Sequence, residues 1–347
     1  MNVKTVLVTG GAGYIGSHTC KALAQAGYLP VVFDNLSEGH RWAVRYGPFI
    51  EGDLADARLL EDALKTHQPC AVIHFAASAY VGESMLDPQK YFRNNVGGTI
   101  SLLEATKAVG IRQIVFSSSC ATYGVPQSTP IPEEHSQNPI SAYGESKFFA
   151  ERLLHWHASA YGLQYVALRY FNAAGADPRG ELGEEHDPET HLIPLAIRTA
   201  LGQEKQLQIF GTDFETRDGT AIRDYIHVCD LADGHVVALR HLEQCGTSEA
   251  INLGTGRGVS VRDVVRCVER VSGERVPVAE MPRRAGDPAV LVADARKAKS
   301  LLGWRARRSD LKTIVQTAWN WHAARVLANE SVEALPVASM RQAPAAG

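Results

Sequence analysis

A tyrosine and a lysine four residues apart carry the clearest chemical signal in this sequence. Tyr143 and Lys147 bound the run Tyr-Gly-Glu-Ser-Lys inside a stretch with helical periodicity. Residues spaced i and i+4 share one face of a helix. The lysine charge would favour the tyrosinate, so we expect Lys147 to lower the pKa of Tyr143. A tyrosine with a lowered pKa can take the proton of a hydroxyl group while hydride leaves the same carbon.

Three consecutive serines precede this pair. Ser117, Ser118 and Ser119 end an apolar run that we expect to be the fifth strand of a sheet. We expect Ser119 to hydrogen-bond the reacting oxygen, and we expect Ser117 and Ser118 to be structural. A cap on the following turn or helix is the alternative role for Ser119.

A glycine-rich loop near the N-terminus predicts the hydride acceptor. Gly10, Gly13 and Gly16 lie in the spacing GxxGxxG, between a β-branched run and an amphipathic stretch. Such a loop needs residues without a Cβ atom, and the helix that follows presents free N–H groups to a pyrophosphate. Asp34 ends the next apolar run, where a carboxylate accepts a hydrogen bond from a ribose 2′-hydroxyl and repels a 2′-phosphate. We therefore expect NAD rather than NADP as cofactor.

Two later segments extend the expected cofactor site. Asp53 follows the third apolar run, where adenine would lie, and the small residues of the run 75–79 would let backbone approach the ligand. The glycines within 254–258 stand outside any dinucleotide-binding unit, so we expect a structural turn there.

The elements that hold these residues are predicted from hydrophobic periodicity. Short apolar runs predict strands at 3–8, 30–33, 49–51, 71–75, 113–117 and 165–168. Amphipathic runs predict helices at 15–26, 57–67, 88–109 and 142–161. The alternation indicates an α/β fold, namely a Rossmann-type doubly wound parallel sheet with a smaller C-terminal α/β substrate domain. We place the cofactor domain at 1–174 with returning segments near 220–248, the substrate domain at 175–330, and a disordered tail at 331–347.

The composition excludes several classes of protein. The chain has 347 residues, with 35 Lys and Arg against 38 Asp and Glu, for a formal net charge of −3. That balance argues against a nucleic-acid binder, which would normally be strongly basic. No apolar run approaches the roughly 18 residues that cross a bilayer, so we expect no membrane association. Six scattered cysteines lack a CxxC pair, which predicts reduced thiols and a cytoplasmic location.

Two pairs of histidines raise a metal hypothesis that we do not favour. His155 and His157 would point apart on a helix, and His186 and His191 fall in a polar loop. The expected chemistry needs no metal, so we predict no metal ligands.

Together these motifs resemble the extended short-chain dehydrogenase/reductase superfamily and, within it, the UDP-glucose (UDP-galactose) 4-epimerases. The runs that carry the resemblance are 10–18, 34–36, 81–84, 94–96, 143–147, 168–172, 219–228, 252–254, 283–287 and 303–304. The resemblance covers residues 3 to about 325.

The resemblance implies a nucleotide-sugar 4-epimerase with tightly bound NAD that is regenerated in each turnover. Tyr143 would deprotonate the sugar 4-hydroxyl, and hydride would pass from C4 to NAD+. The 4-keto sugar would rotate about its link to UDP before hydride returns to its other face. Lys147 could also bond the nicotinamide ribose. Free rotation requires that the protein hold the nucleotide rather than the sugar. The family also implies a homodimer, formed through the helix of Tyr143.

The resemblance further implies which residues contact each ligand, with Tyr143, Lys147 and Ser119 as the catalytic group. The implied cofactor contacts are Gly10, Gly13, Tyr14, Ile15, Gly16, Asp34, Asn35, Asp53, Leu54, Phe75, Ala76, Ala77, Ala79, Asn94, Ser119, Tyr143, Lys147, Tyr170 and Phe171. The implied UDP-sugar contacts are Ser119, Tyr143, Asn172, His191, Leu192, Gln208, Phe210, Arg223, Arg284, Asp287 and Leu291.

Four positions depart from the family pattern. Ala79 stands where some members have lysine, Cys120 interrupts the commoner Ser-Ala-Thr/Ala-Val-Tyr run, and His191 replaces a frequent asparagine. Leu291 aligns with a position where tyrosine excludes an N-acetyl group. UDP-xylose/UDP-arabinose and UDP-GlcNAc/UDP-GalNAc 4-epimerisation therefore stay open as alternatives.

Other functions are less favoured. Dehydratases that act on nucleotide sugars usually carry an Asp-Glu pair where this chain has the run 120–122, Cys-Ala-Thr. A net reductase is the other enzymatic alternative. A catalytically idle NAD-binding regulator would usually show a damaged Tyr–Lys pair, whereas Tyr143 and Lys147 are both present.

Overall fold

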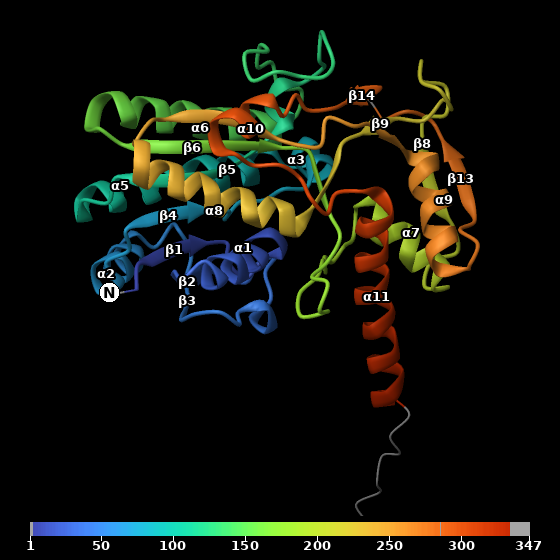
Figure 1. The fold of residues 1–347 in the computed structure, drawn as a ribbon, viewed down its shortest axis with the longest axis horizontal. Coiled ribbons are helices and arrows are strands. Elements are labelled where there is room, and N and C mark those ends of the chain that lie inside the picture. The colour runs from blue at the N-terminus through green and yellow to red at the C-terminus, as the bar shows by residue number, and fades with distance from the viewer. Residues whose placement is uncertain (1–2, 285, 334–347) are drawn as a thin grey trace, which may run out of the picture.

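A seven-stranded parallel sheet forms the centre of the protein, whose computed structural model describes residues 3–284 and 286–333. Its strands are β1 (Thr5–Thr9), β2 (Leu29–Asp34), β3 (Phe49–Glu51), β4 (Ala71–His74), β5 (Gln113–Ser119), β6 (Gln164–Tyr170) and β11 (Glu249–Leu253). The spatial order is β11-β6-β5-β4-β1-β2-β3, and every adjacent pair is parallel. The chain winds outward from β1 in both directions, so the expected doubly wound α/β fold is confirmed (Figure 1).

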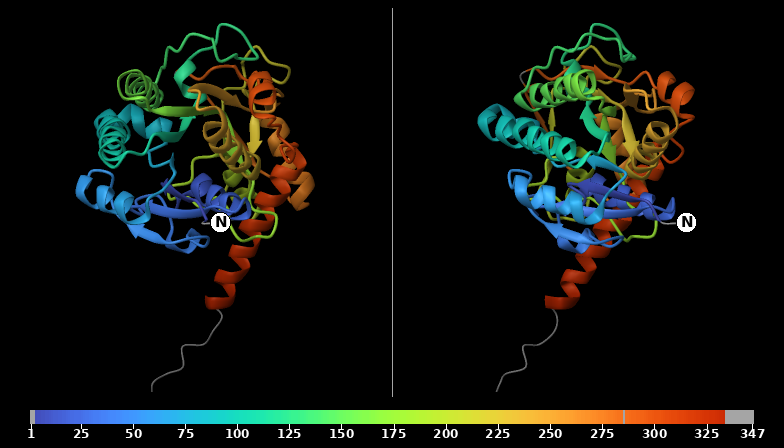
Figure 2. Two further views of the ribbon diagram at one scale, coloured as in Figure 1. Left: turned by 60° about the vertical axis from the view of Figure 1, so that its left-hand side comes forward. Right: turned by 90° about the vertical axis from the view of Figure 1, so that its left-hand side faces the viewer.

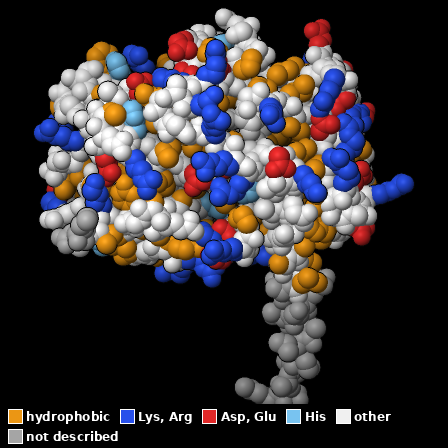
Figure 3. Space-filling model, in the orientation of Figure 1, with side chains coloured by type: hydrophobic (Ala, Val, Ile, Leu, Met, Phe, Trp, Pro, Cys, Tyr) orange, Lys and Arg blue, Asp and Glu red, His pale blue; other side chains and the backbone are white. Residues whose placement is uncertain are grey.

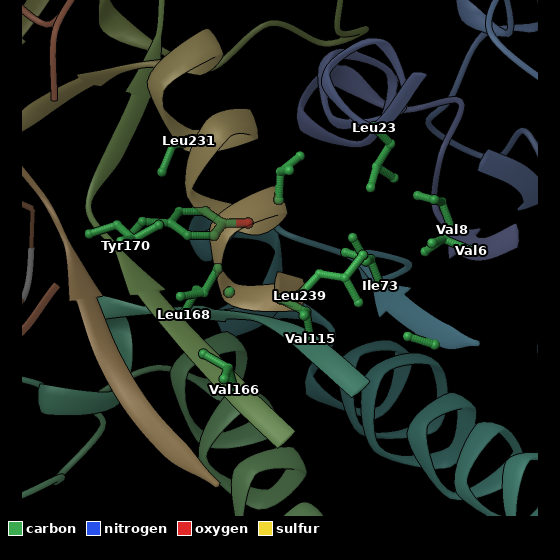
Figure 4. Close-up of a cluster of buried hydrophobic side chains, with 14 of the residues drawn as sticks. Val6, Val8, Leu23, Ile73, Val115, Val166, Leu168, Tyr170, Leu231 and Leu239 are labelled. Atoms are coloured by element: carbon green, nitrogen blue, oxygen red, sulfur yellow. The ribbon is translucent and has the colours of Figure 1, made fainter. Parts of the chain in front are cut away.

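Helices cover both faces of this sheet. The first face carries α1 (Tyr14–Gln25) and α8 (Val228–Cys245), and the second carries α2 (Ala57–His67), α5 (Gly98–Val109) and α6 (Ala142–Tyr161). Successive strand side chains point to opposite faces, so Val8 packs with the first pair of helices and Leu7 with the second group. Figure 4 shows the first layer, in which Leu23 and Leu239 approach Ile73. Burial on both faces explains the nearly continuous apolar runs of these strands.

A smaller body with its own apolar core lies beside the sheet (Figures 1 and 2). It contains α7 (Leu192–Ala200), α9 (Val261–Ser272), α11 (Leu311–Glu333) and the parallel pair β8 (Leu207–Phe210) and β13 (Val278–Met281). Two short sheets join the bodies: β10 (Tyr225–His227) with β7 (Asn172–Ala174), and β12 (Val259–Ser260) with β9 (Ile222–Arg223) and β14 (Val290–Leu291). The far end of α11 projects beyond both bodies in every view.

The expected helix over 88–109 is interrupted. The structure has α4 (Pro88–Tyr91), a π-helical turn η2 (Phe92–Gly97), and then α5. Such π turns often occur at functional sites, and this one contains Asn95, whose carboxamide bonds Ser78 and Ser146. Further short elements are η1 (Arg41–Ala43), α3 (Val81–Leu86), η3 (Cys120–Tyr123) and α10 (Arg296–Leu302).

The structure adds detail at two of the expected domain boundaries, which stay predictions. The segment that returns to the large sheet is α8 followed by β11, because β9 pairs instead within the small sheet. The expected tail at 331–347 overlaps α11, which continues to Glu333. The remainder of that tail, 334–347, lies outside the described residues.

The surface mixes charges of both signs. On the face drawn in Figure 3, basic and acidic side chains lie among one another, in keeping with a net charge of −3. Among the described residues, no helix combines the length and apolar character that crossing a membrane requires.

A buried ion pair fixes the helix that carries Tyr143 and Lys147. Glu151 of α6 and Arg169 of β6 are 7% and 5% exposed, and Arg169 Nη2 lies 2.6 Å from Glu151 Oε2. Arg169 Nε donates to the other carboxylate oxygen at 2.9 Å, so the contact is bidentate. Ser118 of β5 also donates to Oε1. The carboxylate therefore ties α6 to two strands at once.

We expect Glu151→Gln to lower the free energy of unfolding by about 3 kcal/mol or more, because it leaves the Arg169 guanidinium buried without a counter-charge. Urea unfolding of the full-length chain measures the change. The matched control is Glu61→Gln, since the exposed carboxylate of Glu61 pairs with Lys65 on α2 and such pairs contribute little. A Glu151 variant as stable as this control would contradict the anchoring role of the pair.

Candidate active site

The loop between β1 and α1 passes closer to a neighbouring segment than a side chain would allow. Gly10 has a φ of +72°, and a Cβ atom there would lie 2.5 Å from the Ala76 nitrogen. A Cβ atom on Gly16 would lie 2.1 Å from the Gly10 carbonyl oxygen. Gly13 has more room, because its nearest such neighbour is 3.4 Å away. Packing within the protein therefore requires Gly10 and Gly16, whereas Gly13 leaves space at the start of α1.

The first turn of α1 fits a bound pyrophosphate. Its N-cap residue is Gly13, and no side chain caps the turn. The N–H groups of Tyr14, Ile15 and Gly16 therefore have no acceptor within the helix, and the helix dipole adds partial positive charge at this end. The Tyr14 side chain points to another segment, since its hydroxyl donates to the Gly175 carbonyl at 2.5 Å. This loop therefore offers backbone N–H groups, rather than side chains, to the cofactor phosphates.

Asp34 lies at the end of β2, where the adenosine ribose is expected. Its Oδ2 accepts from the Ala12 N–H at 2.9 Å, and its Oδ1 accepts from the Leu36 N–H at 2.8 Å. Burial raises the pKa of Asp34 above its usual value, although these two hydrogen bonds oppose the rise. A carboxylate has about four acceptor positions, so two stay available for ribose hydroxyls.

A cavity of about 710 Å³ has Asp53 and Asn94 in its wall. Asn35 Nδ2 donates to Asp53 Oδ2 at 2.7 Å, which links this cavity to the end of β2. Leu54 is buried next to Gly98 at the same place. The structure thus brings together four of the residues that the sequence analysis assigns to the cofactor.

The segment that leaves β4 is held against the glycine loop. The N–H groups of Phe75 and Ala76 both donate to the Thr9 carbonyl, at 2.9 and 3.1 Å. Ala77 follows in this segment, and Ala79 is exposed. The strand itself ends at His74, one residue earlier than expected.

An asparagine that the sequence analysis did not single out joins this segment to α6. Asn95 Oδ1 accepts from the Ser78 N–H at 2.8 Å, and its Nδ2 donates to Ser146 Oγ at 2.9 Å. Asn94 Nδ2 donates to Ser78 Oγ at 3.2 Å. The consecutive asparagines were the available signal, but the sequence alone does not show which strand-end loop they reach.

The three proposed catalytic side chains converge where β5 meets α6. Ser119 is the last residue of β5, Tyr143 stands in the first turn of α6, and the Ser119 side chain lowers the pKa of Tyr143. Ser119 Oγ accepts from the Ala121 N–H at 3.1 Å, so it has the capping role that was the alternative; its bond to the reacting oxygen stays a prediction. Lys147 Nζ lies 6.0 Å from the Tyr143 ring centre and donates to the Ser117 carbonyl at 2.9 Å. An oxygen of a ligand can be bonded by both hydroxyls at this point.

The charges of this group differ from the sequence-based expectation. Burial raises the pKa of Tyr143 to about 12, and only the hydrogen bond with Ser119 lowers it. Burial also lowers the pKa of Lys147 to about 7, against the attraction of Glu151. The expectation that Lys147 lowers the pKa of Tyr143 is therefore wrong for the protein alone. Burial outweighs any effect of a lysine whose own charge is disfavoured and whose Nζ bonds Ser117.

Tyr170 and Phe171 support the site from the end of β6. The Tyr170 hydroxyl bonds Ser117 Oγ on the neighbouring strand. Phe171 is buried in a small apolar cluster with Tyr123 and Ala293. Both residues were assigned to the cofactor site. In the protein, Tyr170 contacts the end of β5 and Phe171 contacts this cluster.

Several residues assigned to the UDP-sugar gather around the small sheet. Arg223 of β9 is paired with Leu291 of β14 in register, and its guanidinium bonds the Asp287 carboxylate. Asn172 opens β7, and its N–H donates to the Asp224 carbonyl at 3.0 Å. Asp224 is fully buried and holds the turn at 254–258 through the Thr255 and Gly256 amides. That turn has the structural role expected of it.

Arg284 lies against Phe210, and Gln208 stands on the same face of β8 as Phe210. The Arg284 guanidinium lies 4.0 Å from the centre of the Phe210 ring. Gln208 is exposed between two buried strand residues. Arg283 is directed instead toward Asp213, with its Nε 2.7 Å from Asp213 Oδ1.

His191 and Leu192 stand at the start of α7. His191 is the N-cap residue of that helix and Leu192 is its first residue. His191 Nδ1 lies 2.7 Å from Glu184 Oε1. The side chain assigned to the substrate is thus already engaged, through one ring nitrogen, by a carboxylate that the sequence analysis did not consider.

Comparison with known proteins identifies relatives over nearly the whole chain. The sequence profile of the NAD dependent epimerase/dehydratase family matches residues 6–254. The UDP-glucose 4-epimerase of Rhizobium leguminosarum bv. trifolii is 54% identical over 320 residues, which are 92% of this chain and 98% of that protein. The UDP-glucose 4-epimerase of Brucella ovis, solved in complex with NAD, matches with a TM-score of 0.90 and 58% identity over 92% of this chain and 98% of that one.

A third relative was solved with NAD+ and UDP together. The UDP-glucose 4-epimerase of Bifidobacterium longum, in complex with NAD+ and UDP, matches with a TM-score of 0.89 and 38% identity over 93% of this chain and 99% of that one. The glycine loop, the strand ends and the Ser–Tyr–Lys group described above all lie within the matched region. The chain therefore belongs to the NAD dependent epimerase/dehydratase family, in which its relatives are UDP-glucose 4-epimerases.

Proposed function

We propose that this chain is a UDP-glucose 4-epimerase that interconverts UDP-glucose and UDP-galactose with tightly bound NAD. The proposal rests on the placement of Ser119 at the end of β5 and of Tyr143 in the first turn of α6. This pair shares one edge of the parallel sheet with the glycine loop, where doubly wound folds bind their ligands. The relatives support the assignment of NAD and a UDP-sugar as ligands, since one relative was solved with NAD and another with NAD+ and UDP.

Tyr143 and Ser119 have complementary tasks at the sugar. Tyr143 takes the proton of the 4-hydroxyl as the alcohol is oxidised, and returns it as the ketone is reduced. Ser119 hydrogen-bonds the same oxygen in both states. NAD+, when bound, supplies the acceptor and then the donor of the C4 hydride. Because the pKa of Tyr143 alone is about 12, the tyrosine needs a nearby positive charge before it acts as a base near neutral pH.

Lys147 is the ionisable side chain next to Tyr143 and Ser119. Burial lowers its pKa to about 7, so its charged and neutral forms are both accessible near neutral pH. Its Nζ is held by the Ser117 carbonyl on the same strand that carries Ser119. A charged Lys147 would stabilise a tyrosinate on the same helix face.

We assign substrate binding to the small sheet and to the segments that lie beside it. Arg223 and Arg284 supply fixed positive charge and the bidentate donors that suit a diphosphate. Arg223 is oriented by Asp287, and Arg284 by the Phe210 ring. Holding the nucleotide leaves the sugar free to turn, which inversion at C4 requires because hydride leaves one face and returns to the other.

The range of sugars depends on the space beside the catalytic pair. Leu291 packs against the cluster that contains Phe171, and so does Cys120, the residue after Ser119. A leucine is smaller than the tyrosine that excludes an N-acetyl group in the family. Leu291 therefore leaves UDP-GlcNAc open as an alternative substrate, whereas Ala79 and Cys120 are the positions that leave UDP-xylose open.

We extend the proposal to a homodimer in the cytoplasm. The adjacent helices α5 and α6 expose Ile100, Phe149 and Trp156, and exposed apolar patches of this kind mark interfaces. The Phe92 ring meets the Phe149 ring edge-on at 6.1 Å and continues the patch. The six cysteines are all free, which suits a reducing compartment.

We expect Tyr143→Phe to keep its bound NAD and to lose about 10²- to 10⁴-fold in turnover, because it removes the acid–base group without changing the ring. The assay follows UDP-glucose formation from UDP-galactose with no NAD added. Tyr161→Phe is the matched control, since Tyr161 stands exposed at the last turn of the same helix. A near-normal rate for Tyr143→Phe would remove that residue from the acid–base role, and inactive unmodified protein with NAD still bound would indicate a regulator.

We expect Leu291→Tyr to depress activity on UDP-GlcNAc at least tenfold more than activity on UDP-glucose, because the larger ring fills space beside Cys120. Parallel measurements of kcat/KM on the two substrates give the ratio. Equal losses on both sugars would refute the assignment of Leu291 as the residue that limits sugar size.

A further inference from the structure

Four potential metal ligands gather in the loop between β7 and α7. Glu184, His186, Glu189 and His191 each place one ligand atom within 4.8 Å of the other three. Two imidazole nitrogens and two carboxylate oxygens form a donor set that suits Zn²⁺ and related divalent metals. This group lies outside the Ser–Tyr–Lys group.

The contacts within this cluster converge on a shared centre. Nδ1 of His191 lies 2.7 Å from Glu184 Oε1, and Nδ1 of His186 lies 3.3 Å from the same oxygen and 3.7 Å from Glu189 Oε2. Despite this closeness, Glu184 Oε1, His186 Nδ1 and Glu189 Oε2 are buried and lack a hydrogen-bond partner among the described residues. Donors and acceptors that approach one another without the geometry of a hydrogen bond are arranged as ligands of a common ion would be.

The charge of the cluster calls for a cation. The side chains of Glu184 and Glu189 are 4% and 0% exposed, and a buried carboxylate is costly unless its charge is compensated. With both imidazoles neutral, as metal ligation requires, the cluster carries two negative charges, which one divalent cation neutralises. Two protonated histidines would neutralise it equally, and the experiment below separates the two cases.

The surrounding structure holds the ligands in place before any ion binds. Glu189 Oε1 accepts from the Thr190 and His191 N–H groups at 2.8 and 2.9 Å, which leaves Oε2 for the centre. The Glu184 carbonyl accepts from Trp321 Nε1 of α11 at 3.1 Å. The His186 ring meets the Tyr14 ring of α1 edge-on, at 6.3 Å. Ligands fixed by such outer contacts favour metal binding.

We propose that Glu184, His186, Glu189 and His191 bind one divalent transition-metal cation of the Zn²⁺ class. The site would fasten the loop between α1 and α11, which Figure 1 shows lying between these helices. The chain runs directly from this loop into α7, whose first residue is Leu192. The role is structural and goes beyond the proposed epimerase reaction, which needs no metal. No ligands were expected here because the loop is polar and the expected chemistry needs no metal, whereas in the structure the carboxylates of Glu184 and Glu189 are buried.

The test is direct titration of the untagged full-length protein, dialysed against EDTA and then against a non-chelating buffer. Isothermal calorimetry with ZnCl₂ is expected to show one site per chain, and Co²⁺ in place of Zn²⁺ is expected to give the visible absorption of a four-coordinate site. Glu189→Gln and His186→Gln are each expected to weaken Zn²⁺ binding by at least about 100-fold, more than the loss of an outer contact to a ligand. His155→Ala, which removes an exposed histidine of α6, is expected to bind as the unmodified protein does.

Two results would overturn the proposal. One is unmodified protein that takes up no Zn²⁺, which would leave the cluster as an ion-paired group with protonated histidines. The other is folded Glu189→Gln protein that binds Zn²⁺ as tightly as the His155→Ala control, which would place the metal elsewhere. If His186→Gln does not fold, the titrations of the unmodified protein and of Glu189→Gln still decide the question. Epimerase activity is not the readout, so failure here is distinct from failure of the proposed function.

Discussion

The docking of α6 on the large sheet is the constraint on which the active site depends. Tyr143 and Lys147 lie in the first turns of that helix, and Ser119 ends the strand beside it. Glu151, about one turn beyond Lys147, is held by a buried bidentate contact with Arg169 of β6 and by a hydrogen bond from Ser118 of β5. A carboxylate between two strands fixes both the rotation and the translation of the helix. This contact and the apolar layer beneath α6 hold Tyr143 at the end of the sheet where β5 ends in Ser119.

The cofactor site and the substrate site consist of two different kinds of group. At the edge of the large sheet the cofactor site is mostly backbone, since Gly10 and Gly16 admit no side chain and the first turn of α1 is uncapped. At the small sheet the substrate site is mostly side chains, with Arg223 and Arg284 each oriented by a neighbour. Backbone contacts suit a cofactor that stays bound through each turnover. Arginines that bind a diphosphate suit a substrate whose sugar must rotate while its nucleotide stays in place.

The features that could be predicted from the sequence are those set by local spacing. The glycine loop, Asp34 at a strand end, and the pair of Tyr143 and Lys147 on one helix face all depend on residues close together in the chain. The doubly wound parallel sheet followed from the alternation of strands with helices, and the bounds expected for the helices at 57–67 and 142–161 match α2 and α6.

The features that could not be predicted depend on packing between distant segments. The rise in the pKa of Tyr143 results from burial, which a sequence motif does not display. Asn95 joins the end of β4 to α6 through a π turn that interrupts an otherwise regular helical pattern. The cluster around Glu184 is buried by α1 and α11, which lie far from it in the sequence.

The central claim is that hydride leaves C4 of the sugar and returns to it without leaving the protein. The most direct measurement uses UDP-galactose with deuterium at C4 and purified protein with no NAD added. Because the hydride is held on the tightly bound cofactor between the two half-reactions, the predicted product is UDP-glucose that keeps deuterium at C4. UDP-glucose with protium at C4 would contradict this mechanism, and so would protein that retains NAD yet forms no UDP-glucose.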